Sequence, residues 1–286
     1  MNALVVGCGS IGRRRAKILL GQGHAVTVYD TSDDAAMLAC ANLSAAGNVD
    51  ALAAGAAWPR ASYDVALICT PPDSGRPEQI QQYLGMGVRG LFVEKPLALG
   101  LSDVDEIANT FPYDERALVD GDVVIAPITM GACNLRFCGG VSGLAKIRRP
   151  WRLARFTMRQ AAKHWSPTHR PISLILDSIH ELDLAVHLQG PIESIRGYSE
   201  LDAAEVSVHH EDGGLSHIFL DRVTSPPVRE VQVIRKGDYD SLAIQTKDSM
   251  YEREMEHFME CVEKGVPTCN PLREAAEICA RALEVA

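Results

Sequence analysis

The chain has 286 residues, of which 47% are hydrophobic and 23% charged, and its formal net charge is −9. This composition is ordinary for a soluble globular protein, and the length suffices for two domains of about 100–200 residues. The acidic balance argues against nucleic-acid binding, which needs a basic face. Since no apolar run approaches the roughly 20 residues of a membrane span, we expect neither nucleic acid nor a membrane as a partner.

The eight cysteines include no Cys-x-x-Cys pair and no Cys/His cluster with the spacing of zinc ligands. They lie in apolar stretches, so we expect reduced core thiols and no metal site. A strand is predicted to begin almost at Met1, and we therefore expect no signal peptide. These features together predict a cytoplasmic protein.

The first part of the chain alternates between short apolar runs and helical stretches. Helices are expected from the end of the segment 7–12 to about 21, at about 77–86 and at about 101–110, and strands at 3–6, 25–29, 65–69, 91–93 and 123–128. Strands that are buried on both faces read as continuous apolar runs. Their alternation with helices predicts an α/β fold, in which a doubly wound parallel sheet has helices on both faces.

The pattern changes further along the chain. One helix is expected within 171–190 and closing helices at 250–264 and 271–286, with strands at 152–159, 193–200, 203–210, 215–223, 228–235 and 241–246. Several strands in succession without helices indicate an antiparallel sheet. We predict two domains: 1–122 with the parallel sheet, and 123–286 as an α+β domain with a large, mostly antiparallel open sheet.

A glycine-rich loop, Gly7-Cys8-Gly9-Ser10-Ile11-Gly12, follows the first predicted strand and opens the first helix. Gly7 permits the tight turn, Gly9 lets the backbone approach a pyrophosphate, and Gly12 lets helix and strand pack closely. The N–H groups at the helix start, at Ser10 and Ile11, face the phosphates. In this context the loop predicts a dinucleotide-binding Rossmann domain over 1–122. The alternative is a glycine-rich turn with no ligand.

Asp30 closes the second predicted strand, 18 residues after Gly12. A carboxylate there accepts hydrogen bonds from the ribose hydroxyls of NAD and repels the 2′-phosphate of NADP, so NAD is the expected cofactor and NADP the less favoured one. Arg13, Arg14 and Arg15 complicate the electrostatics, because they are either a solvated surface or an attraction for anionic ligands. Asp30 is alternatively a helix N-cap without a ligand.

Three motifs together resemble the glucose–fructose oxidoreductase / inositol dehydrogenase family (Gfo/Idh/MocA). They are the glycine loop, Thr70-Pro71-Pro72 and Glu94-Lys95-Pro96, each following a predicted strand. Loops beyond the carboxyl ends of such strands line the cofactor crevice, so Thr70, Pro71, Glu94 and Lys95 are candidate cofactor-binding residues. From the residues alone, a Pro-rich turn explains Thr70-Pro71-Pro72 equally well. Further downstream, Asn134-Leu135-Arg136-Phe137, the Asp…His…Asp pattern of 177–184 and the closing segment 270–277 are also similar to this family.

The resemblance implies that Lys95 lies by the nicotinamide and the reacting hydroxyl, and that Asp177 and His180 face the same point. It also implies hydride transfer at secondary hydroxyl carbons of sugars, polyols or nucleotide-linked sugars, in a homodimer or homotetramer built through the open face of the C-terminal sheet. The chain departs from the family pattern in places. The spacing of Asp177 and His180 is three rather than the common four, and with the string 180–183 it resembles a branch of the family associated with acidic or amino sugars. In addition, Asp73-Ser74-Gly75-Arg76 stands where many members have a histidine.

Oxidising an alcohol needs a hydride acceptor, a base and a group that stabilises the developing alkoxide. His180 is the best candidate base, because histidine exchanges protons near neutral pH. Lys95 suits the electrostatic role, or the role of the base where burial favours its neutral form. Asp177, on the same helical face as His180, orients it or binds a substrate hydroxyl. The alternatives are a surface lysine, a structural histidine and, for Asp177, a helix N-cap; Glu94 is expected to brace Lys95.

Polar residues of the second predicted domain are candidates for the substrate. His164 and Trp165 can stack on a sugar and hydrogen-bond it, and Arg170 can hold a carboxylate or phosphate bidentately. The alternative is that these residues form an ordinary connection. Asn134 and Arg136 are similar candidates.

The sequence therefore predicts an NAD(P)-dependent oxidoreductase that acts on a sugar-like small molecule. Two alternatives stay open: an enzyme that keeps and recycles its NAD, such as a redox-assisted glycosidase or epimerase, and a non-catalytic NAD-binding regulator. The presence of Lys95, Asp177 and His180 argues against the regulator, because a sensor does not need them.

Overall fold

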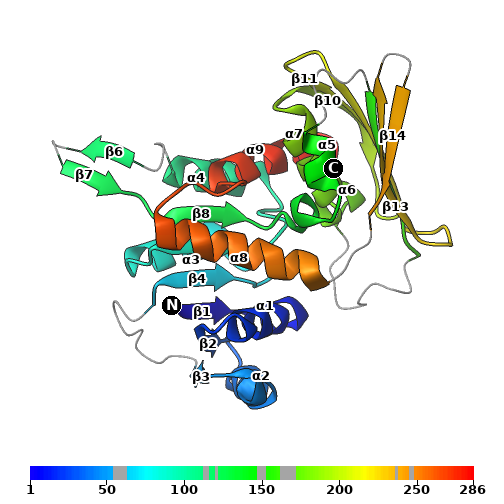
Figure 1. Ribbon diagram of the computed structural model, residues 1–286. Helices are drawn as coiled ribbons and strands as arrows, with labels where there is room; N and C mark the ends of the chain where they lie inside the picture. Colours follow the sequence, from blue (N-terminus) through cyan, green and yellow to red (C-terminus); the bar gives the residue numbers. More distant parts are fainter. Residues whose placement is uncertain are drawn as a thin grey trace. The chain divides into compact units, whose positions relative to one another are not determined.

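The computed structural model describes residues 1–53, 63–111, 116–119, 122–146, 153–161, 172–235, 238–244 and 248–286. The chain forms two compact units: the first unit is Met1–Ala132 with Tyr251–Ala276, and the second unit is Cys133–Met250 with Glu277–Ala286. Each unit contains its own six-stranded sheet (Figure 1). Among the helices of the described ranges, none has the length and apolar character needed to cross a membrane.

A parallel sheet forms the centre of the first unit. Its strand order is β3-β2-β1-β4-β5-β8, and all neighbouring strands run parallel. The order reverses between β1 and β4, which is the arrangement that leaves a crevice at the carboxyl ends of these two strands. The strands are β1 (Asn2–Val6), β2 (Ala25–Tyr29), β3 (Val49–Leu52), β4 (Val65–Ile68), β5 (Gly90–Val93) and β8 (Ile128–Gly131).

Helices from both ends of the chain complete the first unit. Phe258 of α8 meets Phe92 of β5 edge to face, with ring centroids 5.6 Å apart. Gly90 permits this close approach, because a Cβ there would lie 2.4 Å from Val262 Cγ2 of α8. The helical elements are α1 (Ser10–Gly21), α2 (Asp33–Leu43), η1 (Ser44–Ala46), α3 (Arg76–Gly85), α4 (Leu101–Thr110), α8 (Asp248–Lys264) and the start of α9 (Leu272–Leu283).

The last strand of the parallel sheet differs from the prediction. The single strand expected at 123–128 is wrong: β7 (Asp122–Ile125) forms a hairpin with β6 (Arg116–Val119), and a separate strand, β8, joins the main sheet. Ala126-Pro127 divides β7 from β8. Proline has no N–H to donate to a strand ladder, which is a physical reason for the interruption.

The second unit is built on a mixed, mostly antiparallel sheet with the order β10-β11-β12-β9-β13-β14. Within the described residues of this sheet, β9 and β12 are the one parallel pair, and the other neighbouring strands run antiparallel. The predicted fold class is thereby confirmed. The strands are β9 (Leu153–Arg159), β10 (Ile192–Ser199), β11 (Ala203–His210), β12 (Leu215–Asp221), β13 (Val228–Arg235) and β14 (Asp238–Ala243), and the helical elements are η2 (Asn134–Phe137), α5 (Val141–Ala145), α6 (Leu174–Asp177) and α7 (His180–Gln189).

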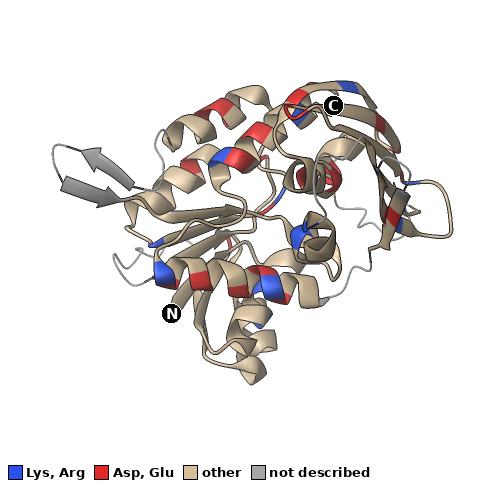
Figure 2. Cartoon of the chain, turned by 45° about the horizontal axis from the view of Figure 1, so that its top comes forward, with Lys and Arg blue, Asp and Glu red and all other residues tan. Residues whose placement is uncertain are grey.

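Burial alternates along the strands of this second sheet. In β11, Ala204, Val206, Val208 and His210 are buried, and the residues between them are more exposed. The buried face packs under α6 and α7, which contact β11, β12 and β9. Figure 2 shows Lys and Arg positions set among Asp and Glu positions along helices such as α8.

The helix expected within 171–190 is interrupted. Helix α6 ends at Asp177, α7 begins at His180, and Ser178 between them has φ −107° and ψ 36°. Asp and Ser are weak helix formers, because their side chains compete for backbone hydrogen bonds. The prediction that Asp177 and His180 share one helical face is therefore wrong. The N-cap interpretation of Asp177 is wrong too, because Asp177 is the last residue of its helix.

Candidate functional site

The glycine loop between β1 and α1 combines close packing with open space. A Cβ at Gly12 would lie 1.8 Å from the carbonyl oxygen of Gly7. Gly7 itself has φ +95°, and a Cβ there would lie 2.9 Å from the backbone of Cys69. At Gly9, in contrast, a Cβ would meet nothing within 4 Å. Gly7 and Gly12 are thus required for packing, and Gly9 leaves room for a ligand to approach the backbone.

The N-terminus of α1 has the character of an anion-binding site. Its N-cap is Gly9, no side chain caps the helix, and its first turn has no acidic residue. The first N–H groups of a helix lack intrahelical partners, and the helix dipole gives this end a partial positive charge. A pyrophosphate bound there would accept hydrogen bonds from these N–H groups, including those of Ser10 and Ile11.

Asp30 lies beside this loop, directly after β2. Its Oδ2 accepts a hydrogen bond from the N–H of Cys8 at 2.7 Å, and its Oδ1 accepts one from the N–H of Ser32 at 3.1 Å. The N-cap of α2 is Ser32, whose hydroxyl accepts from the N–H of Ala35. The interpretation of Asp30 as an N-cap is therefore wrong. A carboxylate has about four acceptor positions, so Asp30 can also accept from ribose hydroxyls.

Two thiols lie next to these loops, those of Cys8 and Cys69. Burial, together with the nearby Asp30 carboxylate, raises the pKa of Cys8 to about 11. Burial also raises the pKa of Cys69, and the Glu94 carboxylate acts in the same direction. Both thiols are free and stay protonated at neutral pH, so neither is suited to act as a nucleophile.

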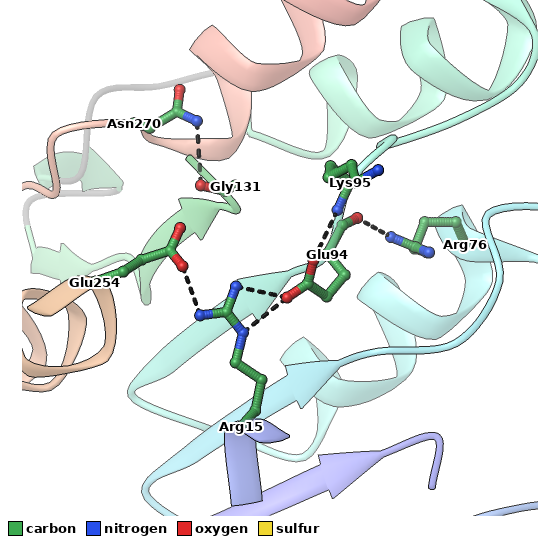
Figure 3. Close-up of polar contacts among 7 residues, drawn as sticks. All are labelled: Arg15, Arg76, Glu94, Lys95, Gly131, Glu254 and Asn270. Carbon is green, nitrogen blue, oxygen red and sulfur yellow. Dashed lines mark hydrogen bonds and ion pairs between the residues drawn. The ribbon is translucent and has the colours of Figure 1, made fainter. Parts of the chain in front are cut away.

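Arg15 has a structural role that the sequence pattern did not indicate. Its side chain is 1% exposed and bridges two carboxylates: Nε and Nη2 lie 2.7 and 2.6 Å from Glu94 Oε1, and Nη1 lies 2.5 Å from Glu254 Oε2 (Figure 3). The guanidinium also lies 4.7 Å from the ring centroid of Phe92. Both interpretations of this arginine, as solvated surface and as an attraction for ligands, are therefore wrong.

The loop after β5 is held at several points. Glu94 Oε2 accepts a hydrogen bond from the N–H of Lys95 at 3.3 Å. The carbonyl oxygen of Glu94 accepts from Arg76 Nη1 at 2.6 Å, and that of Thr70 accepts from Arg76 Nη2 at 2.7 Å. Glu94 thus braces the backbone of Lys95, while the Lys95 side chain points away from the Glu94 carboxylate (Figure 3).

These residues share one edge of the sheet. They follow the strands β1, β2, β4 and β5, which lie side by side and run parallel: the glycine loop after β1, Asp30 after β2, Thr70-Pro71 after β4 and Glu94-Lys95 after β5. Their carboxyl ends therefore bring all predicted cofactor-binding residues to the same side of the first unit. Among the residues described, no group of three or more His, Cys, Asp or Glu is placed to hold a metal ion.

The second unit contains three pairs of buried acids and arginines around α6 and α7. Asp177 pairs with Arg222, which directly follows β12. Glu181 Oε1 lies 2.6 Å from Arg229 Nε of β13. The Asp183 carboxylate accepts hydrogen bonds from Nε and Nη2 of Arg136, at 3.0 and 2.7 Å.

The residues predicted to bind the substrate differ in their burial and in their hydrogen-bond partners. Arg136 is buried and engaged with Asp183. Asn134 is 4% exposed, and its Oδ1 has no hydrogen-bond partner among the residues that the structure describes. His164, Trp165 and Arg170 lie outside the described residues.

Several site residues were missed by sequence reasoning: Arg76, Arg222, Arg229 and Glu254. Glu254 carried a usable signal, because it lies between Tyr251 and Phe258 on the apolar stripe of α8. A charge at helical spacing within an apolar stripe indicates a buried partner. The arginines carried no such local signal.

Comparison with known proteins identifies the first part of the chain. Residues 1–119 match the model of the Gfo/Idh/MocA family, described as an oxidoreductase family with an NAD-binding Rossmann fold. The match confirms the predicted resemblance and, with it, an oxidoreductase that uses NAD. No curated protein matches the chain.

Solved structures share the fold over the whole chain. UDP-N-acetylglucosamine 3-dehydrogenase from Acidithiobacillus ferrooxidans is 19% identical, with a TM-score of 0.78, over 100% of this chain and 96% of that one. Myo-inositol 2-dehydrogenase from Lactobacillus plantarum is 16% identical, with a TM-score of 0.79, over 99% and 96%. An oxidoreductase from Agrobacterium radiobacter, in complex with NAD⁺, L-tartaric acid and magnesium, is 14% identical, with a TM-score of 0.79, over 99% and 94%.

Two alanine substitutions in the glycine loop should have opposite effects. Gly12→Ala places a methyl group against the Gly7 carbonyl and should lower the free energy of unfolding by about 3 kcal/mol. Gly9→Ala meets no protein atom and should leave that free energy within about 0.5 kcal/mol, yet weaken NADH binding at least tenfold, because the methyl group occupies the space for the pyrophosphate. Urea denaturation and NADH fluorescence titration measure the two effects. A Gly9→Ala variant with unchanged NADH affinity would contradict this assignment.

Proposed function

We propose that the protein transfers a hydride between NAD and a secondary hydroxyl or keto carbon of a sugar, polyol or nucleotide-linked sugar. The observation that carries the proposal is the carboxyl edge of the first sheet. There, an uncapped helix N-terminus, the carboxylate of Asp30 and the braced Lys95 follow neighbouring parallel strands. Dehydrogenases of UDP-N-acetylglucosamine and of myo-inositol with the same fold support the substrate class.

The residues of this edge fit an extended dinucleotide. The N–H groups at the start of α1 bind the pyrophosphate, and Asp30 accepts hydrogen bonds from the ribose hydroxyls. Thr70, Pro71 and the Glu94-Lys95 loop line the other half of the crevice. The bound nicotinamide supplies the hydride acceptor or donor.

Lys95 is assigned to stabilise the oxygen at which negative charge develops. The Glu94 carboxylate next to it is already paired with the buried Arg15 guanidinium. Since Arg15 neutralises that carboxylate, we assign the positive charge of Lys95 to the reacting oxygen of the substrate.

His180 is assigned to take the hydroxyl proton of the substrate, and Asp177 to accept a hydrogen bond from a neighbouring hydroxyl. Arg222 holds the Asp177 carboxylate in place through their ion pair. The unpartnered Oδ1 of Asn134 within the described residues supports a polar ligand near η2. Arg136, His164, Trp165 and Arg170 stay candidates for substrate binding, with acidic or amino sugars as the favoured substrates.

Asp30 should determine the preference for NADH over NADPH. Wild-type protein should bind NADH at least tenfold more tightly, because the Asp30 carboxylate repels the 2′-phosphate, and Asp30→Ala should remove most of this difference. Fluorescence titration with both dinucleotides measures it. Asp34→Ala, at an exposed position in the first turn of α2, is the matched control. Wild-type protein that binds neither dinucleotide would contradict the proposed function itself.

Replacing Lys95 should separate binding from chemistry. With a panel that includes UDP-N-acetylglucosamine and myo-inositol, Lys95→Met should lower kcat at least about 100-fold, because the alkoxide loses its cation, and leave the NADH Kd within about twofold. NADH absorbance follows turnover. Lys17→Met, at an exposed position of α1, is the control. Equal turnover by wild type and Lys95→Met on a shared substrate would refute the role of Lys95.

The outer face of the C-terminal sheet is proposed to join copies of the chain. Two large side chains are exposed there, Tyr198 of β10 at 51% and Tyr239 of β14 at 68%. Tyr198 and Tyr239 lie on the two edge strands, and Tyr239 pairs with Ile234 of β13, which is also exposed. Exposed apolar side chains at both edges of one face favour association over that face. Light scattering at micromolar concentration should return the mass of a dimer or tetramer, and a Tyr239→Glu variant should shift it toward the monomer. A monomeric wild-type protein would contradict the proposal.

A further inference from the structure

Arg76 is the first residue of α3, and its side chain is completely buried at 0% exposure. Its two terminal nitrogens reach the carbonyl oxygens of two different loops. Nη1 donates to Glu94 at 2.6 Å (Figure 3), and Nη2 donates to Thr70 at 2.7 Å. We infer that Arg76 is a positioning residue for the nicotinamide half of the cofactor. The inference rests on the proposed function and concerns the same site.

The two loops that Arg76 joins belong to one half of the crevice. Thr70 follows β4 and Glu94 follows β5, and these strands are neighbours on one side of β1, whereas Asp30 follows β2 on its other side. A dinucleotide whose adenosine ribose binds at Asp30 extends across the switch point between β1 and β4. Its nicotinamide end therefore reaches the loops after β4 and β5, which are the loops that Arg76 holds.

The position of Arg76 is not explained by the stability of its own helix. A cation in the first turn of a helix faces the positive end of the helix dipole, which is unfavourable. Burying a guanidinium adds a desolvation cost. The charge-assisted hydrogen bonds to Glu94 and Thr70 offset these terms, because hydrogen bonds from a charged donor are about twice as strong as neutral ones. The arginine is therefore placed to connect the loops.

Arg76 and Arg15 hold the Glu94-Lys95 segment from two sides. Arg15 binds the side-chain carboxylate of Glu94, and Arg76 binds its main-chain carbonyl (Figure 3). With both groups fixed, the direction of the next residue, Lys95, is fixed too. The planar guanidinium reaches the two carbonyls with two separate nitrogens in a fixed geometry, whereas a lysine ammonium carries all its donors on one nitrogen.

Comparing NADH with ADP-ribose tests the inference without a known substrate. ADP-ribose carries the adenosine and pyrophosphate parts but lacks the nicotinamide. By calorimetric titration, Arg76→Ala should raise the NADH Kd about tenfold and change the ADP-ribose Kd less than twofold, because the loops after β4 and β5 lose their connection while the glycine loop and Asp30 are untouched.

Chemical rescue distinguishes positioning from a general loss of structure. Guanidinium chloride at a few millimolar, far below denaturing concentrations, should enter the cavity of Arg76→Ala and restore most of the NADH affinity. Arg76→Lys keeps the charge but loses the fixed geometry of two separate donor nitrogens. It should show an intermediate loss of affinity for NADH and none for ADP-ribose, and it also serves if the alanine variant does not fold. Arg89→Ala is the control, because the Arg89 side chain is 55% exposed and lies at the opposite end of β5.

The outcomes separate this inference from the proposed function. Equal losses for NADH and ADP-ribose in the Arg76 variants, or no loss for either, would overturn the positioning role while the proposed function stands. Wild-type protein that binds ADP-ribose and NADH with equal affinity would also overturn it, because the nicotinamide then makes no contribution. Wild-type protein that binds neither would overturn the proposed function, and the inference with it.

Discussion

The ion pair between the buried Arg15 guanidinium and the carboxylates of Glu94 and Glu254 is the interaction on which the first unit depends. It joins α1, the loop after β5 and α8, which are far apart in the sequence. Removing one partner of a buried pair typically costs about 3–5 kcal/mol, because the other charge is left unpaired. The glycine loop and the Glu94-Lys95 loop therefore keep their positions relative to each other through the buried charge of Arg15.

In a parallel sheet, the loops that follow the strands all lie at the carboxyl edge. The groups proposed to bind and react with the dinucleotide therefore lie at one edge of the first unit. The start of α1 offers N–H donors, Asp30 offers acceptors, and Lys95 offers a cation, each after a different strand. Arg76 then adds a cross-connection between two of these loops. The edge thus combines an open, ligand-accessible surface at Gly9 with a closely packed and charge-paired support beneath it.

The second unit is also held together by pairs of acidic residues and arginines. Asp177, Glu181 and Asp183 lie in the segment where α6 gives way to α7, and each pairs with an arginine from a different element. Three neutralised acids in one short segment hold the break at Ser178 in place and orient the start of α7, where His180 lies. Arg222 thereby gives Asp177 a defined direction that the helix alone would not provide.

The sequence by itself determined the features that depend on local pattern. Apolar runs alternating with helices specified the parallel sheet, the glycine loop and Asp30 specified the dinucleotide edge, and strands in succession specified the second sheet. Only the tertiary structure decided the partners of Arg15, Arg76, Arg222 and Glu254, the division of 122–131 into β7 and β8, and the break between α6 and α7. The reason is physical: a periodicity reports which face of an element is buried, whereas the partner of a buried charge is set by which distant segments meet, and no local pattern records that.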